Sequence, residues 1–292
     1  MALGSVLRPN AAVATSNVVG WGSDWSGESQ VPGGAYTAVA GGYARSLAIR
    51  TDGTLAAWGA GGPPPNGTFT SIAVGYAHFL GIRTNGTIIT WGDTWPAPSG
   101  TFTAVAAGTS HSLGIRTDGT LAAWGSNYYG QCNVPGGTFS AVAAGGAHSL
   151  GIRADGTLAA WGSNGSGQCN VPSGTFTAVA AGAYSSLALR SDGTLSAWGW
   201  NAQGQCDVPS GTFSAVAAGQ LYSLAVRTDG TLVAWGDNRF GQCDVPGGAY
   251  SAIAAGHYHG LAIVVPEPSC LAALGLALAG FGAAGFVQRR RR

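Results

Sequence analysis

The chain has 292 residues, of which 50 are glycine, more than twice the share of roughly 7% in average proteins, and only 9% are charged. Hydrophobic residues make up 46%, which excludes a disordered chain, and the glycines follow no three-residue period, which excludes collagen. Lysine is absent, and four of the 13 arginines occupy positions 289–292. The rest of the chain therefore has more acids than cations, and no basic patch for nucleic acid is expected.

Residues 1–17 precede the first regular pattern. They contain one arginine, Arg8, and no long apolar stretch. Ala12-Val13-Ala14 resembles the small-residue end of a signal peptide. We therefore interpret this segment as the remnant of a signal peptide whose start lies upstream.

A repeated unit fills the middle of the chain, and residues 139–171, FSAVAAGGAHSLGIRADGTLAAWGSNGSGQCNV, show one full copy. Its marker is a Trp-Gly pair that returns after 33 or 37 residues, at Trp21, Trp58, Trp91, Trp124, Trp161, Trp198 and Trp235. Self-similarity over so long a stretch defines one repeat domain, residues 18–264.

Each unit contains three predicted strands, for example residues 102–108, 112–116 and 120–125. Asp118-Gly119 separates the second strand from the third, and such a pair favours a two-residue type I′ hairpin turn with positive φ at both central residues. Equivalent pairs occur at Asp52-Gly53, Asn85-Gly86, Asp155-Gly156, Asp192-Gly193 and Asp229-Gly230. Six hairpins with this glycine content exclude a helical solenoid and leave a β-propeller or a β-solenoid.

The two ends of the repeat domain decide between an open array and a ring. The first Trp-Gly strand, residues 18–22, precedes every other strand, and the last unit lacks a strand of this type. Pairing the spare strand with the last unit would complete a seventh blade and remove the exposed edges of an open array. The sequence therefore predicts an all-β, seven-bladed β-propeller closed by its N-terminal strand.

Residues 110–131, SHSLGIRTDGTLAAWGSNYYGQ, resemble the repeat of the regulator of chromosome condensation family. The 37-residue spacing and the GQCNVP linker are similar to those of shorter-repeat bacterial members, which include a propeller-type β-lactamase inhibitor protein. The resemblance implies a propeller. It does not imply one function, because this fold hosts exchange factors, inhibitors and many other binding proteins.

Residues 265–292 form a different kind of segment. A 17-residue uncharged run, 271–287, predicts a C-terminal hydrophobic helix at the short end of a membrane span, with the arginines holding its end on the cytoplasmic side. A buried hydrophobic helix is the alternative. The segment resembles the PEP-CTERM sorting signal in Pro266, Glu267, Pro268, Arg289, Arg290, Arg291 and Arg292. That resemblance implies export in a bacterium, recognition by an exosortase-type enzyme, transient membrane anchoring and delivery to the cell envelope or extracellular matrix.

Cysteine and histidine recur at fixed positions of the repeat. Cys132, Cys169, Cys206 and Cys243 lie too far apart for disulfides in neighbouring blades and lack a CxxC spacing, so we expect buried, unpaired thiols. His78, His111, His148 and His259 could form a metal ring, but packing and turn hydrogen bonds are favoured.

Arginine also recurs, at the end of the second strand of six units. A ring of arginines could bind a polyanion. We favour packing along the blade with hydrogen bonds to turn carbonyls and carboxylates. The positions are Arg50, Arg83, Arg116, Arg153, Arg190 and Arg227.

The loops after the first and third strands should share one side of the ring, the upper rim, and the uniform Asp-Gly turns should form the lower rim. The upper loops vary and are rich in aromatic residues and arginine, which are favoured interface anchors. They predict a recognition surface for protein or glycan, with a plug of the propeller mouth as the alternative. The candidate residues are Trp25, Tyr43, Tyr76, Trp95, Tyr128, Tyr129, Tyr184, Trp200, Tyr222, Arg239, Phe240 and Tyr258.

These features together predict an exported, monomeric binding or scaffold propeller without catalytic activity, cofactor or metal. A polysaccharide lyase or hydrolase is the alternative, although its upper-loop acids are only Asp24, Glu28, Asp93 and Asp237 and no two-carboxylate pattern is visible. A third hypothesis is nucleotide exchange or chromatin binding. The sorting tail and the absence of lysine argue against it.

Overall fold

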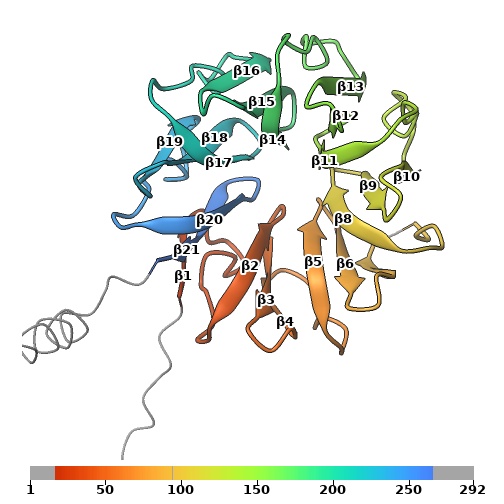
Figure 1. The fold of residues 1–292 in the computed structure, drawn as a ribbon. Helices are drawn as coiled ribbons and strands as arrows, with labels where there is room; N and C mark the ends of the chain where they lie inside the picture. The colour runs from red at the N-terminus through yellow and green to blue at the C-terminus, as the bar shows by residue number, and fades with distance from the viewer. Residues whose placement is uncertain (1–16, 94, 266–292) are drawn as a thin grey trace, which may run out of the picture.

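The computed structural model describes residues 17–93 and 95–265, and the regular elements in these ranges are 21 β-strands in seven antiparallel sheets. The sheets stand side by side around a central axis as seven blades (Figure 1). The predicted seven-bladed, all-β repeat fold is thereby confirmed. The predicted signal-peptide remnant, apart from Asn17, and the predicted C-terminal helix lie outside the described residues.

Each blade has an inner, a middle and an outer strand. Blades 1 to 4 are β2 (Tyr36–Gly41), β3 (Arg45–Arg50), β4 (Leu55–Gly59); β5 (Phe69–Val74), β6 (His78–Arg83), β7 (Ile88–Gly92); β8 (Phe102–Ala107), β9 (His111–Arg116), β10 (Leu121–Gly125); and β11 (Phe139–Ala144), β12 (His148–Arg153), β13 (Leu158–Gly162). Blades 5 to 7 are β14 (Phe176–Ala181), β15 (Ser185–Arg190), β16 (Leu195–Gly199); β17 (Phe213–Ala218), β18 (Tyr222–Arg227), β19 (Leu232–Gly236); and β20 (Tyr250–Ala255), β21 (His259–Val264), β1 (Val18–Gly22).

The N-terminal strand closes the ring. β1 pairs antiparallel with β21, with Val18 opposite Ile263 and Trp21 opposite Gly260. A Cβ at Gly260 would lie 2.2 Å from the Trp21 indole, so glycine makes room for this ring. The inner strands of successive blades contact one another around the whole circle, and β20 meets β2. The predicted closure is confirmed.

The hairpin turns differ from the predicted type I′. Gly53 has φ +84°, but no residue other than glycine has positive φ in the described part of the chain. The N–H of Gly53 donates to the carbonyl of Arg50 (2.9 Å), and the N–H of Arg50 donates to the carbonyl of Thr54 (2.8 Å). These bonds define a three-residue loop that ends in a left-handed glycine. Asp52 Oδ1 stabilises it by accepting from the backbone N–H (2.9 Å) and the hydroxyl (2.7 Å) of Thr54.

The core lies in the middle strands, where one leucine per blade is no more than 1% exposed. These residues are Leu47, Leu80, Leu113, Leu150, Leu187, Leu224 and Leu261. Burial on both faces suits the near-continuous apolar character of these strands. Among residues 17–93 and 95–265, no helix has the length and apolar character needed to cross a membrane.

Candidate functional site

The loops after the inner and outer strands lie together on the upper rim. The backbone N–H of Trp200, after an outer strand, donates to the carbonyl of Tyr184, after an inner strand, at 2.9 Å. Asp237 makes the same bond to Leu221, also at 2.9 Å. This repeated bond places the two variable loop sets next to each other on one side of the ring.

Six rings form one continuous group on this rim, which we call the aromatic cluster: Trp25, Tyr43, Tyr76, Phe240, His257 and Tyr258. Trp25 lies edge-on to Phe240 (4.9 Å between centroids) and to Tyr258 (5.6 Å). Edge-to-face and tilted contacts at these distances stabilise aromatic groups beyond their burial. The cluster extends from the loop after the outer strand of blade 6, which carries Phe240, across blade 7 to blades 1 and 2.

His257 connects the two halves of the cluster and was missed by the sequence prediction. Its ring lies 4.9 Å from both Tyr43 and Tyr258. Burial lowers the pKa of His257 to about 4, so the imidazole is neutral at pH 7. Aligning the repeats would have revealed it, because His257 occupies the same loop position as Tyr43 and Tyr76.

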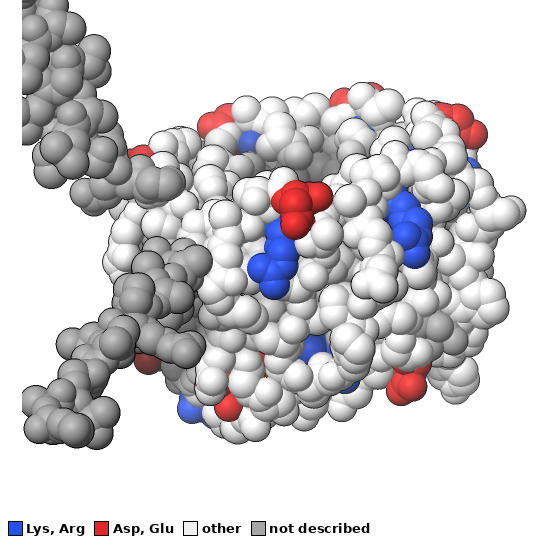
Figure 2. Space-filling model, turned by 90° about the horizontal axis from the view of Figure 1, so that it is seen from below, with Lys and Arg blue, Asp and Glu red and all other residues white. Residues whose placement is uncertain are grey.

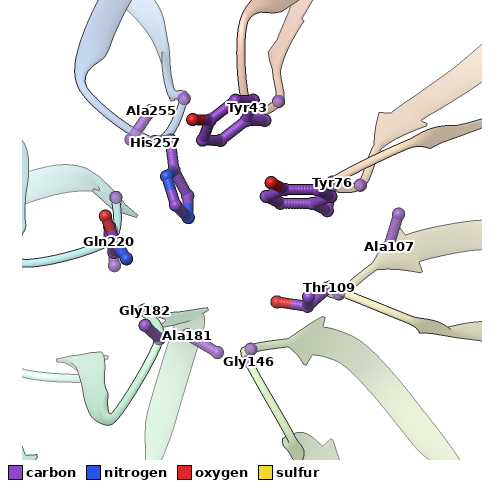
Figure 3. Close-up of a pocket in the computed structure, with 18 of the residues that line it drawn as sticks. Tyr43, Tyr76, Ala107, Thr109, Gly146, Ala181, Gly182, Gln220, Ala255 and His257 are labelled. Carbon is purple, nitrogen blue, oxygen red and sulfur yellow. The ribbon is translucent and has the colours of Figure 1, made fainter. Parts of the chain in front are cut away.

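Part of the cluster surrounds the mouth of the central channel. A pocket of about 90 Å³ lies there, bounded by a ring of Gly and Ala backbone, with Gln220 and Thr109 also at its edge. Tyr76 and His257 point into the opening, and Tyr43 lies along its edge toward His257 (Figure 3). These three rings thus narrow the channel mouth, whereas Trp25 (57% exposed) and Phe240 (38% exposed) remain accessible to solvent.

A buried carboxylate holds the loop that carries Trp25. Glu28 accepts from the Ser23 hydroxyl (2.9 Å) and from the backbone N–H of Trp25 (3.2 Å) and Ser26 (2.7 Å). Burial acts to raise the pKa of Glu28, but these hydrogen bonds hold it below its ordinary value. Trp25 is therefore presented on a fixed loop rather than a loose one.

Arg239 stands beside the cluster as half of an ion pair. Its Nε donates to Oδ1 of Asp237 at 2.8 Å; the arginine side chain is 63% exposed and that of Asp237 is 2% exposed. The hydrogen bond and charge of Asp237 raise the pKa of Arg239. Asp237 also accepts from Gln242, whose own Oε1 accepts from the backbone N–H of Phe240 (2.9 Å).

The structure does not bring the other predicted aromatics into the cluster. Tyr128 and Tyr129 form a separate pair on the blade 3 loop, 4.9 Å apart and 86% and 57% exposed. Trp95, Tyr184 and Trp200 are exposed on the loops of blades 2 and 5. The upper rim thus presents one large aromatic group and several smaller ones.

The assignment of Tyr222 to this surface is wrong. Tyr222 is 1% exposed and takes the position that histidine has in other blades. Its hydroxyl donates to the carbonyls of His259 and Gly256 in blade 7, and burial raises its pKa well above the ordinary value. Tyr222 therefore joins two blades and is not available to a ligand.

The repeated histidines link neighbouring blades. His148 Nε2 lies 3.0 Å from Ser186 Oγ of the next blade, and that hydroxyl donates to the carbonyl of Gln168 (2.8 Å). Equivalent histidine–serine contacts are His78–Ser112, His111–Ser149 and His259–Ser46. Burial lowers the pKa of His111, His148 and His259 to about 4. The favoured structural interpretation is confirmed.

The four repeat cysteines are free, as predicted, but they are half-buried rather than buried. Cys169 Sγ donates to the carbonyl of Ser163 at 3.2 Å, and the other three make the same type of bond. Burial raises the pKa of Cys206 and Cys243 to about 11, with help from nearby aspartates. These thiols therefore stabilise the loops that follow the outer strands through hydrogen bonds to backbone carbonyls.

The repeated arginines lie at the lower rim. Arg116 is stacked over Phe102 at 5.0 Å and donates to the carbonyl of Ser99 (2.9 Å); the other five are stacked in the same way on the first aromatic residue of the inner strand. The turn aspartates bond to threonine instead, so the expected carboxylate contacts are wrong for this ring. One edge of the molecule shows only scattered charges (Figure 2).

Three of the four acids considered for catalysis, Asp24, Glu28 and Asp237, have partners that hold loops. Asp24 accepts from the backbone N–H of Ser29 (3.1 Å) and from Gln30 (2.6 Å), and Asp237 is paired with Arg239. Within residues 17–93 and 95–265, no three His, Cys, Asp or Glu side chains gather as a metal site.

The sequence profile of the regulator of chromosome condensation (RCC1) repeat matches residues 69–94, 102–131, 139–168, 176–205 and 213–242, together half of the chain. The chain belongs to the RCC1 repeat family. No curated relative matches it. Each RCC1 match begins with an inner strand and ends in the loop after an outer strand, so the family pattern and the blades coincide.

Solved structures show the same fold at low sequence identity. Prp20p from Saccharomyces cerevisiae, described with its binding to Gsp1p and histones, is 15% identical with a TM-score of 0.75, covering 90% of this chain and 94% of that one. Human WBSCR16 is 18% identical with a TM-score of 0.73, covering 85% and 100%. The ectodomain of the Physcomitrella patens receptor kinase CR4 is 22% identical with a TM-score of 0.68, covering 80% and 71%. At these identities the likeness establishes the RCC1 propeller alone.

Proposed function

We propose that this chain is an exported, non-catalytic binding propeller of a bacterial cell envelope or extracellular matrix. It recognises a protein or a glycan through the aromatic cluster on its upper rim. The observation that carries the proposal is the exposed pair Trp25 and Phe240, which rests on the rest of the cluster. Exposed aromatics on fixed loops bind with little loss of side-chain entropy.

The loops that carry the exposed aromatic residues are held in place by buried polar side chains, which supports a fixed surface. Glu28 accepts backbone N–H groups of the Trp25 loop, and Gln242 accepts that of Phe240. The engagement of Asp24 and Asp237 in loop contacts supports a non-catalytic role.

The proposed export rests on the sequence of residues 266–292, with its Pro-Glu-Pro motif, apolar run and terminal arginines. An exosortase-type enzyme would process this segment after transient membrane anchoring. The 37-residue spacing and the GQCNVP linker support a place beside shorter-repeat bacterial propellers such as the β-lactamase inhibitor protein. Cell fractionation tests this: the native protein should be found in the envelope or matrix, and Pro266→Ala with Pro268→Ala should retain it in the membrane. Native protein confined to the cytoplasm would exclude export.

Binding is tested by capturing partners from envelope and matrix extracts with the immobilised full chain. Protease treatment of one extract portion and periodate oxidation of another distinguish protein from glycan partners. The Trp25→Ala, Phe240→Ala double variant should weaken capture by ~10-fold or more, the usual effect of losing central aromatic anchors.

The matched control is Thr51→Ala, an exposed substitution on the lower rim. It should leave capture unchanged, and circular dichroism should show both variants folded. Equal capture by the wild type and the double variant would refute recognition through the aromatic cluster.

A further inference from the structure

Two of the blade linkers are shorter than the others. In the long linkers, a glutamine or Glu28 places its backbone carbonyl under the next blade. That carbonyl accepts from a tryptophan Nε1 and usually from a serine hydroxyl: Gln168 accepts from Trp198 and Ser186, both at 2.8 Å. Residues 59–68 and 92–101, before blades 2 and 3, contain no such segment. The two short junctions must therefore be filled in another way or stay open.

The first short junction is filled. Phe79 takes the serine position and is stacked flat on Trp91, with centroids 5.2 Å apart and an angle of 2° between the rings. Arg45, in the histidine position of blade 1, lies over Phe79 at 5.2 Å. Trp91 Nε1 is left buried without a hydrogen-bond partner. Side-chain substitutions thus replace the missing linker at this junction.

The second short junction is open. Blade 3 keeps Ser112, which lies 3.0 Å from His78 Nε2, and in the described part of its linker (93 and 95–101) the small Ala97 packs against the core cluster that includes Trp124. A recess of about 600 Å³ lies between the blade 2 and blade 3 loops, within the size range of roughly 300–1,000 Å³ of ligand pockets. Its lining includes Tyr76, Asp93, Trp95, Thr109 and Ser110.

We propose that this recess binds a neutral sugar residue. Tyr76 (43% exposed) and Trp95 (45% exposed) offer ring faces for the apolar C–H face of a pyranose. Asp93 supplies carboxylate acceptors, and Thr109 and Ser110 supply hydroxyls, for the sugar hydroxyl groups. Small-molecule sites are usually lined by apolar and aromatic side chains, with a small number of polar groups that point toward the ligand.

The charges around the recess favour a neutral ligand. Burial lowers the pKa of Arg45, while Asp93 and Tyr76 act on it in the opposite direction, so the Asp93 carboxylate already has a cation within electrostatic reach. Because Arg45 partly offsets the charge of Asp93, the electrostatic attraction between Asp93 and a cationic ligand would be weaker. An anionic sugar would meet the Asp93 carboxylate in the recess, and Arg45, the cation within reach of Asp93, is engaged over the ring of Phe79.

Tyr76 also belongs to the aromatic cluster, where its ring lies 4.5 Å from that of Tyr43. A second sugar residue leaving the recess would therefore meet Tyr43 and then His257. The proposed site is one end of a surface for a short neutral oligosaccharide. This inference rests on the proposed binding function and specifies its ligand.

The test exposes the full chain to an array of immobilised neutral oligosaccharides, uronic-acid and sulfated oligosaccharides, and arginine- or lysine-containing peptides. We expect binding to neutral oligosaccharides. Trp95→Ala should weaken it ~10-fold, Trp95→Phe should restore most of it, and Asp93→Asn should weaken it by a smaller factor because an amide still bonds hydroxyls. Exchange of residues 93–101 for residues 163–175 should abolish it while raising the melting temperature, since a glutamine carbonyl would then reach Ser112.

The matched control is Trp200→Ala, which removes the same residue type at 46% exposure from blade 5 and should leave binding unchanged. Oligosaccharide binding lost in Trp25→Ala but retained in Trp95→Ala would overturn the recess and leave the proposed function intact. Binding only to cationic peptides, abolished by Asp93→Asn, would overturn the sugar assignment. The sugar assignment would also be overturned if the chain bound nothing on the array but still captured a protein partner from extracts. If the chain bound nothing on the array and captured nothing from extracts, the proposed binding function would be refuted as well.

Discussion

The two rims of the ring are built by the same repeat but carry different amounts of variation. On the lower rim, six arginines are stacked on the aromatic residue that begins each inner strand, at 5.0–5.4 Å, and the turn acids bond to a threonine two residues later. On the upper rim, by contrast, one position of the loop after each inner strand differs in every blade or nearly so. From blade 1 to blade 7 it holds Tyr43, Tyr76, Thr109, Gly146, Ala183, Gln220 and His257. Uniformity follows where the side chain has a structural partner in every blade.

The comparison separates positions that the fold needs from positions that the fold leaves free. The Asp-Gly turn must supply a left-handed residue and a cap, so its chemistry hardly changes. The upper loops are anchored by backbone hydrogen bonds, such as Trp200 N–H to the Tyr184 carbonyl, which place no demand on side-chain type. Binding residues can therefore be placed there without loss of the ring.

The largest expected effect concerns Tyr222, which is close to the upper rim in sequence but belongs to the body of the ring. Tyr222→Ala should lower the free energy of unfolding by about 3–5 kcal/mol, because it empties a fully buried site and removes the bond to blade 7. Tyr222→Phe should cost about 1–3 kcal/mol because the Gly256 carbonyl loses its donor, whereas the His259 carbonyl keeps the backbone N–H of Gly256 at 2.8 Å. Urea denaturation measures both. A Tyr222→Ala variant of normal stability with weakened ligand binding would return Tyr222 to the binding surface.

The next effect is a dependence of stability on pH that arises from three histidines in the blade junctions and from His257 on the upper rim. Burial lowers the pKa of His111, His148, His257 and His259 from 6.5 to about 4, so the unfolded chain binds protons first as the pH falls. Stability contributed by the neutral rings is complete above pH 6.5 and is lost progressively between pH 6.5 and 4.

Thermal unfolding of the full chain at pH 7.5, 6 and 5 would show the decline. His148→Gln should flatten it, since glutamine can still bond Ser186 but does not titrate. A slope unchanged by this substitution would show that the junction histidine does not carry the effect.

The repeat period, the spare first strand and the packed interior were predictable from sequence because each follows from a pattern that recurs in every unit. The turn type was not, since the carboxylate of Asp52 stabilises a right-handed conformation that the dipeptide alone does not reveal. Tyr222 was assigned to the wrong place because it lies one residue after the last loop position, the position that Tyr184 and Tyr258 hold in their blades. It is the first residue of β18, and its ring is buried there.

The site was predictable as a collection of residues and not as an arrangement. Nothing in the sequence indicates that Trp25 and Phe240, at opposite ends of the repeat domain, lie 4.9 Å apart, because ring closure brings them together. The recess beside Trp95 was also invisible. It arises from the absence of a segment whose carbonyl role in other blades, as at Gln168, is apparent only in three dimensions.

The smallest expected effect tests the uniformity of the lower rim directly. Arg116→Ala and Arg190→Ala remove the same guanidinium stack and the same bond to a linker carbonyl, of Ser99 and Ser173, in two different blades. Each should lower the free energy of unfolding by about 1 kcal/mol, the usual worth of such a contact at a partly exposed site. Because Arg190 Nε also bonds Ser196 at 2.6 Å, its replacement should cost slightly more. Neither variant should change ligand capture, since both side chains lie on the side opposite the aromatic cluster. Chemical denaturation and capture assays on the same preparations check both statements, and an arginine variant that retained its stability but lost its ligand would place recognition on the lower rim.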